Sequence, residues 1–209
     1  MLFLCLLFPL GFLIWCRAQG FEKFPKFALI AFMGLFPSAV FCAYKYFFSP
    51  FYYLTQDSFL MNFFYYFLRQ ILIPIAVLTI VFFFVDGKDS VQERLANIFP
   101  FYAGFYAIYI PFIVLCKDLP YPFFALFAKP AIYFSMILSL PKICAKFFET
   151  QKPDTKALKK ILLIFALVAA ILLPAVIESL WTLGVPAFLT VILTLAYLAA
   201  AAIFSVINK

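Results

Sequence analysis

Long apolar runs separated by short polar segments dominate this chain. Seven runs can be distinguished, and a helix that crosses the hydrocarbon core of a bilayer needs about 20 consecutive apolar residues. The runs cover about 1–16, 27–48, 59–85, 95–116, 123–140, 161–183 and 186–207. The pattern predicts an all-α fold, a polytopic transmembrane helical bundle of about seven spans that forms a single transmembrane domain over residues 1–209.

The polar connections between the runs are short. Gly184 and Pro186 predict a tight turn between the last two spans. The longest connection is predicted from about Lys142 to Lys160 and contains six lysines, and it is too short to fold alone. It is interpreted either as a topology anchor over anionic lipid head groups or as a docking site for an acidic partner.

Composition supports the membrane assignment. Hydrophobic residues make up 67% of the 209 residues and charged residues 12%, whereas a water-soluble chain carries about a quarter charged residues. The first run could be a signal peptide, but its first basic residue, Arg17, follows the apolar stretch instead of preceding it. We therefore expect a retained first helix; cleavage would leave six spans.

The basic residues predict the orientation in the membrane. The net charge is +7, but the lysines and arginines lie in short connections and therefore indicate topology, not nucleic-acid binding. The more basic side carries Arg17, Lys23, Lys26, Lys88, Arg94, Lys142, Lys146, Lys152, Lys156, Lys159, Lys160 and Lys209, against Lys45 and Lys117 on the other. This predicts a multi-pass protein of the plasma membrane, a bacterial inner membrane, with a cytoplasmic C-terminus. Its expected partners are membrane lipids and other membrane-protein subunits.

The sequence shows no pattern typical of catalysis or metal binding. The five cysteines form no CxxC pair and the chain has no histidine, which disfavours the usual metal sites. We find no nucleophile with its base, no pair of intramembrane acids and no Gly-rich phosphate loop. We therefore expect a noncatalytic protein without a cofactor.

Three charged residues lie inside the predicted spans: Arg69, Lys129 and Glu178. Charges within the hydrocarbon are costly and mark functional sites by default. One interpretation is structural: Arg69 and Glu178 pair and fix the packing of two spans, while Lys129 reaches toward the interface. The other is an outward-facing polar pocket that binds an anionic solute or a lipid head group.

Two further patterns follow helical spacing. Tyr102, Tyr106 and Tyr109 fall on one face of the fourth span, and they could line a cavity or pack against neighbouring helices. The last two spans carry small residues four apart, Ala166 with Ala170 and Ala196 with Ala200. Such faces let helices approach closely and could join the two spans as a hairpin or contact another subunit.

The region from about 68 to 148 resembles the Yip family of polytopic membrane proteins. The resemblance rests on LRQILIPIAVL, on DGKDSVQERLANIFPFY leading into the next span, and on Tyr133 within IYFSMILSL. It implies a membrane-organising protein without catalysis. The leading functional hypothesis is an accessory or scaffold subunit of a membrane complex, and the alternative is a small-solute transporter built around Arg69, Lys129 and Glu178.

Overall fold

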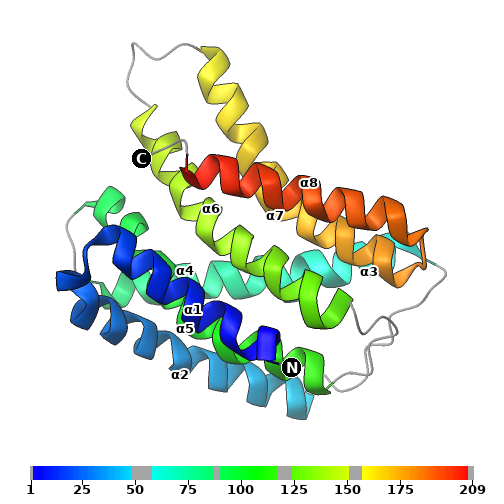
Figure 1. Ribbon diagram of the computed structural model, residues 1–209, viewed down its shortest axis with the longest axis horizontal. Coiled ribbons are helices and arrows are strands. Elements are labelled where there is room, and N and C mark those ends of the chain that lie inside the picture. The colour runs from blue at the N-terminus through cyan, green and yellow to red at the C-terminus, as the bar shows by residue number, and fades with distance from the viewer. Residues whose placement is uncertain (1, 49–57, 87–89, 117–123, 151–156, 207–209) are drawn as a thin grey trace. The chain divides into compact units, whose positions relative to one another are not determined.

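The computed structural model describes residues 2–48, 58–86, 90–116, 124–150 and 157–206, and these are helical almost throughout (Figure 1). No strand occurs within these ranges, so the all-α prediction is confirmed. The α-helices are α1 (Leu2–Gln19), α2 (Phe24–Phe48), α3 (Phe59–Phe64), α4 (Ile73–Val85), α5 (Val91–Cys116), α6 (Lys129–Glu149), α7 (Ala157–Thr182) and α8 (Ala187–Val206). A 3₁₀ turn, η1 (Phe21–Lys23), precedes α2, and two π-helical segments, η2 (Tyr65–Leu72) and η3 (Phe124–Ala128), precede α4 and α6.

The helices have the length and composition of membrane spans. Six of the helices in the described part of the chain are long and apolar enough to cross a bilayer, with α3, η2 and α4 forming one continuous span from Phe59 to Val85. The apolar helix at the start, Cys5–Gln19, is shorter. A helix occupies each of the seven predicted apolar runs, and the chain has the architecture of an integral membrane protein.

The predicted helix boundaries were wrong by four residues or more at three places. Helix α5 begins at Val91, four residues early, because the Ser90 hydroxyl accepts a hydrogen bond from the Glu93 backbone N–H at 3.1 Å and caps the helix. Helix α6 continues to Glu149, and α7 begins at Ala157, within the connection predicted from Lys142 to Lys160. Lysine is a good helix former whose apolar stem covers nearby apolar surface, so the first charge does not end the helix. Residues 151–156 of that connection lie outside the described residues.

The predicted turn between the last two spans is confirmed. Gly184 has φ 72°, a left-handed conformation that costs other residues free energy. Its N–H donates to the Trp181 carbonyl and the N–H of Val185 donates to the Leu180 carbonyl, each at 3.2 Å. These two bonds form a Schellman motif, which satisfies carbonyl groups at the end of α7 and turns the chain toward α8.

The chain divides into two compact units. The first contains Met1–Leu54 and Phe99–Phe134, and the second contains Thr55–Ile98 and Ser135–Lys209. The prediction of a single transmembrane domain stays a prediction, and each unit is described by itself below.

In the first unit, α2 and α5 cross with their backbones in contact. A Cβ atom added to Gly34 of α2 would meet the carbonyl group of Phe101 and the backbone nitrogen of Phe105. A Cβ atom added to Gly104 of α5 would meet the backbone of Ala31. Each glycine therefore removes the side chain that would otherwise hold the two helices apart.

In the second unit, α7 is packed on two sides. It contacts α3 and η2, and it also contacts α8, which lies along it in Figure 1. The Tyr197 hydroxyl of α8 donates to the Ala170 carbonyl of α7 at 3.2 Å. Ala166 and Ala170 thus lie on the face of α7 toward α8, as the hairpin interpretation predicted, whereas Ala196 of α8 is exposed.

Candidate functional site

The π-helical segment η2 carries Arg69 and ends two residues before Pro74. Proline has no N–H to donate to the carbonyl of residue i−4, and its ring clashes with that carbonyl, which here belongs to Gln70. A widened π turn relieves the clash without breaking the helix, and such turns frequently occur at functional sites. The sequence therefore distorts the helix at the position of its intramembrane arginine.

The second π-helical segment, η3, lies directly before the other intramembrane cation, Lys129. It ends at Ala128, and Lys129 and Pro130 follow directly. Proline alone does not produce a π turn, because several other prolines lie within regular α-helix, namely Pro9, Pro37, Pro100, Pro111, Pro141 and Pro174. Within the described residues, the π-helical segments η2 and η3 precede Pro74 and Pro130 alone.

A buried polar cluster connects η2 with the C-terminal part of α7 in the second unit. The hydroxyl groups of Tyr66 and Thr182 lie 2.8 Å apart, and the Thr182 hydroxyl donates to the Glu178 carbonyl at 2.9 Å. Because a threonine hydroxyl has one hydrogen, Tyr66 is the donor to Thr182. We call Tyr66, Glu178 and Thr182 the hydroxyl–carboxylate cluster.

The burial of this cluster distinguishes it from a surface feature. Glu178 is 1% exposed, Tyr66 2% and Thr182 6%. The Glu178 carboxylate also lies close enough to Tyr66 to interact with it electrostatically. The hydrogen bond between Tyr66 and Thr182 joins η2 to α7, so this buried polar contact helps to fix how α7 packs on η2.

Arg69 lies on the segment that packs against α7, where its side chain is half-buried. The structure thus places the arginine and Glu178 on two packed elements of the same unit. Asn62 and Gln70, buried on the same span, add further polar groups there. The predicted ion pair between Arg69 and Glu178 stays a prediction.

Lys129 belongs to the first unit, where it lies next to the predicted tyrosine stripe. Its side chain is 1% exposed, and its Nζ atom is 5.6 Å from the centre of the Tyr133 ring. The Tyr133 ring is 5.5 Å from that of Tyr106, which in turn is 6.1 Å from that of Tyr109. At the other end, Lys45 Nζ lies 5.3 Å from the Tyr109 ring centre. We call Tyr133, Tyr106 and Tyr109 the tyrosine row; it connects two lysines.

The tyrosine row gives these cations an aromatic environment. Ring faces attract ammonium groups, with a larger effect where water is excluded. Further rings enclose the row: Phe8 stacks on Tyr106 at 6.1 Å, and Phe41 and Phe105 contact Tyr109 at 6.2 and 4.8 Å. Tyr102 is also buried. The cavity-lining role predicted for Tyr102, Tyr106 and Tyr109 stays a prediction.

Sequence reasoning missed several of these residues. Lys129 and Tyr133 are four apart on one helix, a spacing that brings side chains together and could have been recognised. Tyr66 and Thr182 are 116 positions apart, and no local pattern connects them. Gly34 with Ser38 forms a small-xxx-small pair that could have indicated the close crossing in the first unit.

Two apolar pockets lie outside these clusters. One, of about 260 Å³, lies in the first unit among α1, α2 and α5 and includes Phe12, Phe32 and Gly104. The other, of about 110 Å³, lies in the second unit among α6, α7 and α8. Neither is lined by Arg69, Lys129 or Glu178. The described residues contain no group of three or more Cys, Asp or Glu side chains placed to hold a metal ion.

Comparison of the chain with protein-family models, with curated proteins and with solved structures finds no match. The resemblance to the Yip family therefore stays a prediction, and function has to be argued from the residues.

Proposed function

We propose that this protein is a noncatalytic accessory or scaffold subunit of a membrane complex. The observation that carries the proposal is the burial of two of its three intramembrane charges: Glu178 and Lys129 are each 1% exposed, whereas Arg69 is half-buried. Charged side chains that are buried between helices stabilise one arrangement of those helices. A membrane-organising role of the kind that the Yip resemblance implies agrees with this proposal.

The outer surface supports contact with other membrane proteins. Large apolar side chains point away from the helices, among them Phe36 of α2, which is 78% exposed, and Ile192 of α8, which is 58% exposed. Such a surface suits both lipid and the apolar face of another subunit. Since the connections are short, partners would be contacted mainly within the bilayer. We propose the bacterial inner membrane as the location, with the C-terminus in the cytoplasm.

The test is co-purification from native membranes in mild detergent, with photo-crosslinking residues introduced at positions 36 and 192. We expect a reproducible crosslink to a second integral membrane protein. Glu178→Gln is expected to lower the yield of that complex, because it removes a buried charge from the helix that packs against η2. Ser179→Ala is the matched control, since the Ser179 hydroxyl donates to a carbonyl of its own helix, that of Ala175, at 2.7 Å.

One observation favours the alternative, a transporter of a small anion or lipid head group. Both π-helical segments lie at intramembrane cations, Arg69 and Lys129, and distorted helices of this kind occur in transport proteins. In reconstituted vesicles a transporter would show solute uptake that Glu178→Gln abolishes. Uptake of this kind by a chain that purifies without partners would overturn the subunit proposal.

A further inference from the structure

The pocket of about 110 Å³ in the second unit is an apolar groove. Five alanines of α7 and α8 line it, namely Ala166, Ala169, Ala170, Ala200 and Ala201. Larger residues, such as Ile143 of α6, complete the lining. The two hydroxyl groups on its lining are already used by the backbone. Tyr197 donates to the Ala170 carbonyl, and Ser139 donates to the Ser135 carbonyl at 2.8 Å. The groove therefore suits a hydrocarbon chain better than a polar solute.

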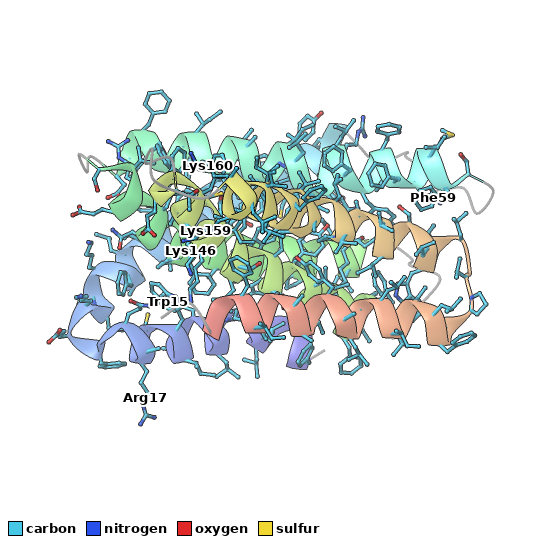
Figure 2. The ribbon with its side chains drawn as sticks, turned by 90° about the horizontal axis from the view of Figure 1, so that it is seen from above. Trp15, Arg17, Phe59, Lys146, Lys159 and Lys160 are labelled. Atoms are coloured by element: carbon cyan, nitrogen blue, oxygen red, sulfur yellow. The ribbon has the colours of Figure 1, made fainter. Side chains whose placement is uncertain are left out.

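One end of the groove lies near a group of lysines. Ile143 is adjacent to Lys142 and three residues before Lys146, which is about 4.5 Å along a helix. On α7, Ala166 follows Lys160 by six residues, or about 9 Å. Figure 2 shows Lys146, Lys159 and Lys160 toward the same end of the second unit, with Phe59 at the opposite end. We call Lys142, Lys146, Lys159 and Lys160 the lysine group.

The charge balance of this end is positive. The described residues 142–150 and 157–160 contain the four lysines of the lysine group against Glu149, a net charge of +3. Phosphate carries the complementary charge, and lysine binds it as a point charge. Basic pockets between transmembrane helices are typical binding sites of anionic lipid head groups.

We propose that the groove and the lysine group together bind one phospholipid with an anionic head group. Its phosphate contacts the lysine group, and one acyl chain lies in the alanine-lined groove between α6, α7 and α8. This differs from a diffuse attraction of lysines to the membrane surface, because the groove selects a lipid that remains bound when the surrounding bilayer is removed.

The test measures the retention of phosphatidylglycerol by the full chain in detergent, using native mass spectrometry, with phosphatidylcholine as the zwitterionic comparison. Two matched pairs of variants distinguish the contribution of the head group to lipid binding from that of the acyl chain. Lys159/Lys160→Gln removes two charges next to the groove, whereas Lys23/Lys26→Gln removes two charges in the other unit. Ala200→Leu fills the groove from its exposed rim, whereas Ala199→Leu enlarges an exposed neighbour that does not line it.

We expect Lys159/Lys160→Gln to weaken phosphatidylglycerol binding roughly 30-fold, from the contribution of two lysines near a membrane surface. Ala200→Leu should also lower retention, while Ala199→Leu and Lys23/Lys26→Gln bind as the natural chain does. Equal effects within both matched pairs would overturn the proposal. Displacement of the lipid by soluble glycerol phosphate would show a bare phosphate site and would overturn the role of the groove. Because the lysine variants alter only helix-end side chains, they keep the test decisive even if Ala200→Leu fails to fold.

Discussion

The close crossing of α2 and α5 predicts that adding a single methyl group will destabilise the first unit. In Gly104→Ala the new Cβ atom would lie 2.8 Å from the carbonyl carbon of Ala31 and 3.2 Å from its Cα atom. Carbon atoms pack best at about 3.5–4.0 Å, so the helices must separate by roughly 1 Å. Backbone atoms cannot rotate away as a side chain can, and the helices must move as bodies.

Two opposing effects determine the size of the change. Alanine is favoured over glycine inside a helix by about 1 kcal/mol, which stabilises the variant. Overpacking costs about 1–3 kcal/mol, and the upper end applies here because the obstacle is backbone. We therefore expect Gly104→Ala to lower the free energy of unfolding by about 2 kcal/mol. Gly34→Ala should act similarly, and the double variant should lose less than the sum because one separation accommodates both methyl groups.

Gly11→Ala is the matched control, because it makes the same chemical change within the same unit. There the added Cβ atom would meet the side chain of Phe134, a half-buried ring that can turn, and not a backbone. The gain in helix propensity and the cost of repacking should nearly cancel. The assay is equilibrium unfolding by SDS in mixed micelles, followed by circular dichroism. If the Gly104→Ala protein were as stable as the Gly11→Ala protein, the close backbone contact between Gly104 and Ala31 would be refuted.

Three further predictions use the same unfolding assay. Gly184→Ala should lower the free energy of unfolding by about 1 kcal/mol, because a φ of 72° is costly for alanine. An unchanged SDS midpoint of unfolding would show that the turn relaxes to another conformation. Tyr133→Leu should lower the free energy of unfolding by about 1 kcal/mol, whereas Tyr133→Phe should lower it less because the ring near Lys129 is kept. Equal losses in the two variants would assign the effect to the hydroxyl group. Tyr66→Phe should lower the free energy of unfolding by about 1 kcal/mol. Thr182→Val should lower it more, because valine removes the hydroxyl that bonds both the Tyr66 hydroxyl and the Glu178 carbonyl. The reverse order would contradict Tyr66 as the donor to Thr182.

The spans could be predicted from the sequence because their determinants are local. A run such as 59–85 must be helical in lipid, where each backbone polar group needs a partner within its own segment. The helix ends were less predictable. Hydropathy alone ended α6 near Leu140, yet the helix continues past Lys142 and Lys146 because charge limits membrane depth and not helicity.

The candidate site could be predicted only in part. Glu178 and Lys129 were identified because charge inside an apolar run is a local signal, and both are buried. Their surroundings depend on contacts between distant segments, such as Tyr66 with Thr182. The π turns before Pro74 and Pro130 could not be predicted from the sequence and became apparent only from the backbone of the structure. Six other prolines inside the described helices leave the α-helical pattern intact.

Among the membrane-length helices of the described residues, burial is highest in the two least apolar ones, in the opposite direction from a water-soluble fold. The two least apolar membrane-length helices, Glu93–Leu115 and Phe124–Glu149, have 72% and 67% of their membrane windows buried. The window of Ala187–Phe204 is more apolar and only 22% buried. Lipid is as apolar as leucine, so hydrophobicity does not drive side chains inward, whereas hydroxyl groups, charges and small residues gain partners there. The tyrosine row and the hydroxyl–carboxylate cluster are the outcome of this rule, and the outer faces of α2 and α8 are consequently the surfaces where a partner subunit should be sought.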